Sequence, residues 1–176
     1  MRHTPIRSLN DISPRRAAVT LCALSFLTIL GAWIFQWAGY LPCELCLKQR
    51  WAYYMGVPIA VGASYLAFIQ QHKILVPIFI ILALLFAFSA MFGFYHAGVE
   101  WGLWQGPTDC TGALDRATSM SDFMNDLRTI KVVRCDAVAI RILGLSLAGW
   151  NGLISCALCA LALIGARGAW AKSHQS

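Results

Sequence analysis

The sequence predicts an all-α integral membrane protein: a bundle of four transmembrane helices joined by two outer loops. Of its 176 residues, 59% are hydrophobic and only 12% are charged, which is too apolar for a soluble domain of this length. Four stretches contain no Asp, Glu, Lys or Arg, and each approaches the roughly 20 residues that a helix needs to cross a bilayer. These runs are continuous and do not alternate apolar with polar residues, so they favour helices over a closed β-barrel.

We expect the membrane spans at residues 17–37, 51–69, 74–94 and 146–166, within a single membrane domain of residues 1–176. The first run follows two arginines, as the apolar part of a signal peptide would. Its apolar part is too long for a signal peptide, however, and no small-x-small cleavage site follows it. We therefore expect a retained anchor.

The distribution of basic residues sets the expected orientation. Seven Lys and Arg residues fall within 30 residues at the two termini and the turn at 70–73, whereas the loops 38–50 and 95–145 carry seven within 64 residues. The side with the higher density of Lys and Arg is expected to be cytoplasmic. We therefore expect both termini in the cytoplasm and the two loops in an oxidising compartment. The net charge of +6 comes from residues that flank apolar runs, so we expect no nucleic-acid binding.

Cys43 and Cys46 form a Cys-x-x-Cys motif in a short polar break after the first span. Two thiols three positions apart can close a small ring or stay reduced at little cost, which favours reversible dithiol chemistry. If the next helix begins near Cys46, that sulfur sits at a helix N-terminus with Arg50 one turn further in, and both features favour its thiolate. Half of a zinc site, or two incidental cysteines, is the alternative, but no second Cys/His pair with zinc-finger spacing lies in an aqueous segment.

Arg50 is an ionisable residue at a membrane helix end, which makes it a functional candidate, although an arginine there can also simply reach the headgroups. Aromatic residues crowd the outer interface around it, where such rings anchor helix ends. Together they could also line a flat, apolar pocket for a ring-shaped, lipid-soluble ligand. These residues are Trp37, Tyr40, Trp51, Tyr53, Tyr54, Tyr95, Trp101 and Trp104.

Cys110 and Cys135 are the only thiols in the loop 95–145. We expect a disulfide between them, either as a structural bridge or as one that exchanges with a partner. Because of the oxidising compartment, we expect this bond and a Cys43–Cys46 bond in the resting protein. Apolar residues between the loop cysteines recur at helical spacing and predict a short amphipathic helix on the membrane surface. They are Met120, Phe123, Met124, Leu127 and Ile130.

Other sulfur and polar residues are expected to be structural. Cys156 and Cys159 form a second Cys-x-x-Cys deep in the fourth span, where apolar surroundings keep thiols protonated, and Cys22 lies in the first span. We expect all three to be free thiols with packing roles. His96 and Glu100, at i and i+4, could bind a metal, but without further ligands we expect interfacial hydrogen bonds.

The placement of Cys43-x-x-Cys46 after the first span, Arg50 four residues further on, and Cys110 with Cys135 in a long second outer loop resembles the disulfide bond formation protein B (DsbB) family. The resemblance covers residues 15–166. It implies a thiol:quinone oxidoreductase of the bacterial inner membrane, with its redox cysteines in the periplasm. Such an enzyme re-oxidises a periplasmic thioredoxin-fold protein of the DsbA type and passes two electrons to ubiquinone, or to menaquinone without oxygen, which sustains protein disulfide formation.

Carried onto this chain, the resemblance also implies roles for single residues. Cys110 would form the mixed disulfide with the soluble partner, and Cys135 would resolve it. Cys43 would link transiently to Cys135, while Cys46 would face the quinone.

The same resemblance implies that Arg50 lies beside Cys46 at the quinone and that His96 is a second quinone-side residue. Gln49 stands where some members carry Glu.

Two other function classes remain as alternatives. A transmembrane thiol electron conduit would need reactive cysteines reachable from both sides, and only Cys156 and Cys159 lie within the membrane for that purpose. A non-enzymatic membrane scaffold with structural disulfides would carry no redox chemistry. A vitamin K epoxide reductase-like enzyme should carry its motif at the outer start of a late helix instead.

Overall fold

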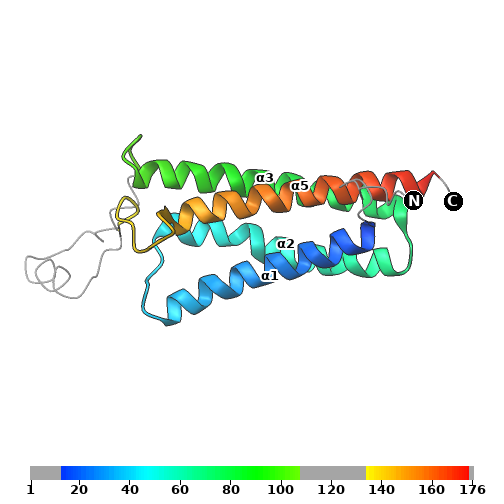
Figure 1. Cartoon of the computed structure of the whole chain (residues 1–176), viewed down its shortest axis with the longest axis horizontal. Helices are drawn as coiled ribbons and strands as arrows, with labels where there is room; N and C mark the ends of the chain where they lie inside the picture. Colours follow the sequence, from blue (N-terminus) through cyan, green and yellow to red (C-terminus); the bar gives the residue numbers. More distant parts are fainter. Residues whose placement is uncertain (1–12, 108–133, 175–176) are drawn as a thin grey trace, which may run out of the picture.

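The computed structural model describes residues 13–107 and 134–174, and four long helices make up most of this part. They are α1 (Pro14–Trp37), α2 (Glu44–Phe68), α3 (His72–Glu100) and α5 (Leu147–Ser173). Figure 1 shows them side by side along the long axis, with the start of α1 and the end of α5 at one end of the bundle and the α1–α2 connection at the other. The predicted all-α fold class is confirmed.

Three of these helices, α1, α3 and α5, are long and apolar enough to cross a membrane. The remaining helix, α2, has sufficient length with 25 residues. Its apolar character is diluted by three tyrosines, by Pro58 and by the charged residues of its first two turns. The span expected at 51–69 therefore stays a prediction.

Side-chain caps mark the starts of α1, α2 and α5. The hydroxyl of Ser13 accepts a hydrogen bond from the backbone N–H of Arg16 at 3.3 Å, and Pro14 occupies the first turn of α1. Such caps define where a helix begins, whereas a charged side chain does not break one. α2 begins at its cap and α3 continues to Glu100, so both helices extend beyond the predicted spans into the segments 38–50 and 95–145 that we expected to be loops.

The chain enters α5 through a small antiparallel hairpin formed by β1 (Arg141–Ile142) and β2 (Leu145–Ser146). Leu143 and Gly144, at its turn, have positive φ angles of 53° and 82°, as the tightest hairpin turns require. Ser146 then caps α5 by accepting a hydrogen bond from the backbone N–H of Gly149 at 3.2 Å. This local structure holds the hairpin next to the start of α5, inside the segment that we expected to be an outer loop.

Each helix packs most closely against two others, in the order α1, α2, α3, α5 and back to α1, and the most extensive packing joins α3 to α5. A Cβ atom on Gly93 would lie 2.8 Å from the backbone nitrogen of Gly152, and one on Gly152 would lie 2.9 Å from the ring of Phe94, so neither position has room for a side chain. Small residues allow such close approach between helices in membranes. On α5, Gly149, Gly152 and Ser155 are buried, whereas the nearby Ala157 faces outward.

Candidate active site

Cys43 ends the α1–α2 connection and caps α2. Its sulfur accepts a hydrogen bond from the backbone N–H of Cys46 at 3.3 Å, so the thiol takes the place that Ser or Asp holds at many helix N-termini. The two sulfurs are 2.8 Å apart, and both residues are free thiols. We expected a disulfide here in the resting protein. The structure instead holds the reduced pair, in which one thiol is hydrogen-bonded to the other.

The two thiols differ in how readily they ionise. A hydrogen bond from the Cys46 thiol, together with His96 and the N-terminus of α2, lowers the pKa of Cys43 to about 5 although burial opposes this shift. Cys46 donates that hydrogen bond and is itself buried, so its pKa is raised. From the sequence we favoured the thiolate on Cys46, on the condition that the next helix begins near that residue. That assignment is wrong because α2 begins at Glu44, which makes Cys43 the capping residue.

His96 and Glu100 lie in the last turns of α3, beside Cys43. The imidazole of His96 is 1% exposed, and its Nε2 is 3.6 Å from the Cys43 sulfur. Oε1 of Glu100 lies 4.0 Å from the same nitrogen, and its side chain is 7% exposed. We expected this pair at the membrane interface. Because α3 continues to Glu100, both side chains are instead buried against the dithiol.

The two sulfurs and the His96 imidazole are close enough to one another, within 4.8 Å, for a metal ion to be considered. A closed structural zinc site uses four ligands, however, and this group offers three. The hydrogen bond between the two thiols and the lowered pKa of Cys43 are properties of a redox centre. We therefore interpret the group as a dithiol with a histidine beside it.

Cys135 brings a disulfide next to this dithiol. It is disulfide-bonded and 2% exposed, and it forms one buried cluster with Cys43 and Leu45, against which Cys46 packs. Cys110, its predicted partner, lies outside the described residues, so the pairing stays a prediction. The amphipathic helix expected between the two loop cysteines also lies outside them.

A cavity of about 510 Å³ lies on the other side of Cys46, between α1, the start of α2, the hairpin and the start of α5. Its volume falls in the range of about 300–1,000 Å³ that is typical of small-molecule sites. Most of its wall is apolar, and Arg50 lies in it. The Arg50 guanidinium donates hydrogen bonds to Oε1 of Gln36 at 2.6 Å and to the carbonyl of Ala32 at 3.3 Å, both on α1. These bonds hold the positive charge at the cavity wall.

Of the aromatic residues expected to line such a pocket, Tyr40 and Tyr53 do so, joined by Phe35 and Trp150. Tyr53 is 2% exposed, so the interfacial anchoring that we expected for it is wrong. A flat, apolar ring with polar oxygens fits this lining, because the cavity combines hydrophobic and aromatic side chains with a few convergent polar groups.

A second, smaller cavity of about 40 Å³ is lined by Cys43, His96 and Glu100. Cys46 lines both cavities. The dithiol therefore stands between them, with Cys43 and His96 facing the smaller one and Cys46 facing the larger one. We expected His96 at the ligand pocket together with Arg50. The structure places it on the opposite side of the dithiol.

Two polar residues of the site, Asn151 and Gln49, were not predicted from the sequence. Asn151 lies near the start of α5 and lines the larger cavity, where it contacts Gln49 and Tyr53. The sequence does contain a signal for Asn151, because a polar side chain inside an apolar membrane segment is unusual and often functional. Gln49 was noted only as a departure from a family pattern, yet it is 7% exposed and hydrogen-bonded to His96.

The remaining described cysteines lie away from this site. Cys22, Cys156 and Cys159 are free thiols, as expected. Cys156 is exposed on the outside of the bundle, and Cys22 and Cys159 pack against its core. None of the three lines either cavity.

The fold and the site together define a helical membrane protein with a buried thiol–disulfide centre. Residues 14–165 match the family model described as "Disulfide bond formation protein DsbB", which covers most of the chain. The chain belongs to the DsbB family, which gives it a general role as a membrane thiol oxidoreductase in disulfide formation. It is also 25% identical over 150 residues to "Uncharacterized protein RP370" of Rickettsia prowazekii (strain Madrid E), an alignment that covers 84% of this chain and 83% of the relative. No solved structure matches the chain.

Proposed function

We propose that this protein is an inner-membrane thiol:quinone oxidoreductase that re-oxidises a periplasmic thioredoxin-fold protein of the DsbA type. The observation that carries this proposal is the position of the dithiol. Cys43 packs beside the disulfide-bonded Cys135, and Cys46 lines a large apolar cavity that also contains Arg50. Electrons can therefore enter at one sulfur and leave at the other.

The exchange begins at the loop disulfide. A thiolate of the partner attacks Cys110 of the Cys110–Cys135 bond and releases Cys135 as a thiolate. The partner's second thiol then attacks the partner sulfur of this mixed disulfide, which closes the partner's own disulfide and releases Cys110. Two electrons have now moved from the partner to the two loop cysteines.

The loop cysteines pass these electrons to the dithiol. The Cys135 thiolate attacks Cys43 of the oxidised Cys43–Cys46 pair and releases Cys46. Cys110 then attacks Cys135, which re-forms the loop disulfide and releases Cys43 as a thiolate. The burial of Cys43 and Cys135 in one cluster supports this transfer, because the two residues already pack together.

A quinone bound in the larger cavity would supply the two-electron acceptor. Cys46 and Arg50 would face it from the wall. The guanidinium, held by its two hydrogen bonds to α1, would stabilise negative charge on Cys46 and on an acceptor oxygen without having to reorient. A strong electron acceptor is needed because a DsbA-type disulfide has a reduction potential of roughly −120 mV, and few protein disulfides are more oxidising.

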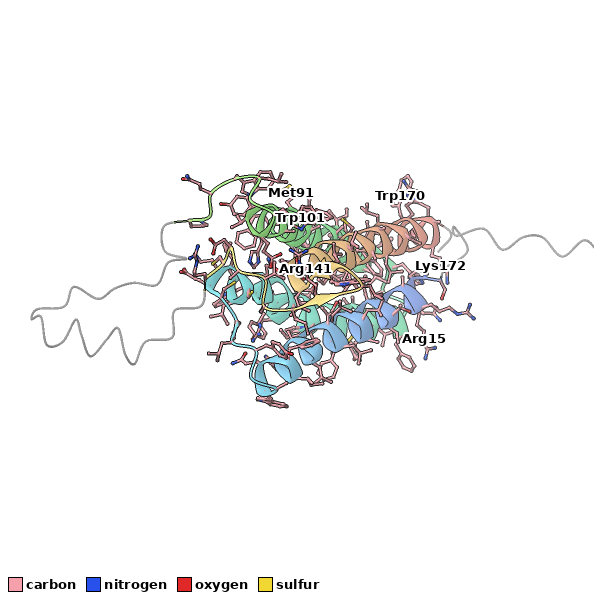
Figure 2. All side chains as sticks on the ribbon, turned by 60° about the vertical axis from the view of Figure 1, so that its left-hand side comes forward. Arg15, Met91, Trp101, Arg141, Trp170 and Lys172 are labelled. Carbon is pink, nitrogen blue, oxygen red and sulfur yellow. The ribbon has the colours of Figure 1, made fainter. Side chains whose placement is uncertain are left out.

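The arrangement of the bundle supports the proposed orientation. The ends of α1 and α5 that carry Arg15 and Lys172 lie at one end of the molecule, whereas the connection that carries the dithiol lies at the other (Figures 1 and 2). With basic residues on the cytoplasmic side, both termini would be cytoplasmic and the redox cysteines periplasmic.

The decisive experiment mixes the purified protein with a reduced DsbA-type partner and a soluble short-chain ubiquinone, and then repeats the mixture with a menaquinone analogue. We expect quinone absorbance to fall as the partner becomes oxidised, with one quinone reduced for each partner disulfide formed. A partner that stays reduced while the quinone stays oxidised would overturn the proposal and favour a conduit or a scaffold. Cys22→Ser is the control, because its thiol lies outside both cavities.

A further inference from the structure

A row of polar side chains leads from the Cys43 sulfur into the bundle. Nε2 of Gln49 is 2.8 Å from Nδ1 of His96. The amide nitrogen of Asn151 donates to Oε1 of Gln49 at 2.9 Å, and the hydroxyl of Tyr53 donates to Oδ1 of Asn151 at 2.7 Å. The row joins α3, α2 and α5, and we call Tyr53, Asn151 and Gln49 the relay.

The order of donors and acceptors in the relay determines where the His96 proton lies. Because Tyr53 donates to the oxygen of Asn151, the amide nitrogen of Asn151 points to the oxygen of Gln49. The nitrogen of Gln49 then faces Nδ1 of His96, and an amide nitrogen can only donate. A neutral imidazole carries one N–H. Its hydrogen is therefore on Nε2, the atom 3.6 Å from the Cys43 sulfur.

Burial keeps the relay in this arrangement. Gln49 is 7% exposed, Tyr53 is 2% exposed and His96 is 1% exposed, so a broken hydrogen bond in the row would leave a polar group buried without a partner. The hydroxyl of Tyr53 is further supported by Ser155, whose Oγ lies 3.0 Å away. Side-chain amides act as fixed donors and acceptors and do not titrate. The relay therefore orients His96 and does not carry protons through the bundle.

We propose that Tyr53, Asn151 and Gln49 are positioning residues that hold His96 with its Nε2–H directed at Cys43, where it stabilises the thiolate. The consequence for turnover rests on the proposed function, in which Cys43 is the sulfur released when the loop disulfide re-forms. A thiol with a lower pKa leaves faster in disulfide exchange. Removing a relay residue should therefore slow this release without touching any sulfur.

Other ionisable groups also face Cys43, and relay variants leave them in place. Cys46 comes from α2, Glu100 from α3 and Arg134 from the segment before β1, and all three line the smaller cavity. The side chains that α5 contributes to that cavity are apolar. A change in the Cys43 titration of a relay variant would therefore report on the orientation of His96.

The test titrates the reduced full-length protein without quinone or partner. The ultraviolet absorbance of the Cys43 thiolate is followed against pH, as the difference from the same protein carrying Cys43→Ser. We expect Gln49→Leu and Asn151→Leu to raise the midpoint by about one unit, which is about tenfold less thiolate at pH values below the midpoint. Tyr53→Phe should leave about threefold less thiolate. Tyr54→Phe is the matched control, because its hydroxyl accepts from Trp33 on α1 and should leave the titration unchanged.

A second measurement reads the tautomer directly. Nitrogen-15 spectra of the reduced wild-type protein should show His96 protonated at Nε2 and not at Nδ1. Protonation at Nδ1, or an unchanged Cys43 titration in both Asn151→Leu and Tyr53→Phe, would overturn the proposal. If Asn151→Leu does not fold, Tyr53→Phe and the wild-type spectrum decide. Neither measurement contains a quinone, so failure of the proposed quinone reduction would leave this result standing.

Discussion

The chain contains the same four-residue pattern twice, and the two copies lie in different surroundings. Cys43 and Cys46 straddle the start of α2, with sulfurs 2.8 Å apart, a buried histidine 3.6 Å from one of them, and a cavity on either side. Cys156 and Cys159 lie in the middle of α5. There Cys156 faces outward, Cys159 packs against the core, and neither lines a cavity.

The difference shows that spacing alone does not make a reactive dithiol. At the start of a helix, a sulfur can accept a backbone N–H that has no carbonyl partner, whereas in mid-helix every such N–H already bonds to the preceding turn. Only the first copy also has neighbouring donors and room for a reactant. The first copy is thus expected to do chemistry and the second to contribute packing, and four predictions test this contrast.

The largest effect should come from disrupting the first pair, Cys43 and Cys46. Cys43→Ser or Cys46→Ser should reduce quinone-linked oxidation of the DsbA-type partner to background, because each change leaves no dithiol to oxidise. The double variant Cys156→Ser, Cys159→Ser should retain most of the rate. Turnover assays with purified variants measure both. Loss of activity in the double variant would mean that the second copy has a redox role after all.

Arg50→Met tests whether the larger cavity serves the first copy. Loss of one preorganised electrostatic donor typically costs about 100- to 1,000-fold in rate, and we expect a loss of that order in quinone reduction. Thiol exchange between the loop and the partner should proceed nearly as before. Arg15→Met is the control. Arg15 lies in the first turn of α1, and its guanidinium stands over the ring of Phe68 at the end of α2. Equal quinone kinetics in the two variants would leave Arg50 only an anchoring role.

Gly93→Ala tests the packing assigned to the region of the second copy. Its new Cβ would meet the backbone of Gly152 at 2.8 Å, and overpacking of this kind typically costs about 1–3 kcal/mol. Gly62→Ala, with nothing within 4 Å of the added carbon, should be neutral or more stable by up to about 1 kcal/mol. Thermal unfolding in detergent measures the difference. If both variants unfold alike, the α3–α5 contact is looser than described.

The smallest effect, when it is counted for a single pH unit, is a pH dependence that only the first copy should produce. Folding lowers the pKa of Cys43, so between the lowered and the ordinary thiol pKa the unfolded chain binds more protons. Stability of the reduced protein should therefore rise with pH in this window, by at most about 1.4 kcal/mol per unit, and be lost as the pH falls through the lowered pKa. The raised pKa of Cys46 contributes only above the ordinary thiol pKa.

Cys43→Ser should flatten this slope, whereas Cys156→Ser should preserve it. Chemical unfolding of the reduced variants between pH 5 and pH 8 provides the comparison. An equal slope in Cys43→Ser would falsify the assignment of the thiolate.

The sequence by itself determined the all-α class and drew attention to the first copy rather than the second. In apolar runs of bilayer length, few structures other than a helix satisfy the hydrogen bonds of the backbone. The distance of each cysteine pair from charged residues can also be read from the sequence without a structure. The resemblance to the DsbB family likewise depended on motif order and spacing, which a linear reading contains.

Only the tertiary structure decided which sulfur is the better thiolate and what surrounds it. α2 begins after a cap at Cys43, whereas the thiolate expected on Cys46 depended on a helix that begins near Cys46. Asn151 is about 100 positions from Gln49 in the chain, and His96 reaches Cys43 from another helix. Contacts of this kind depend on how helices pack side by side, and no spacing along a single chain encodes them.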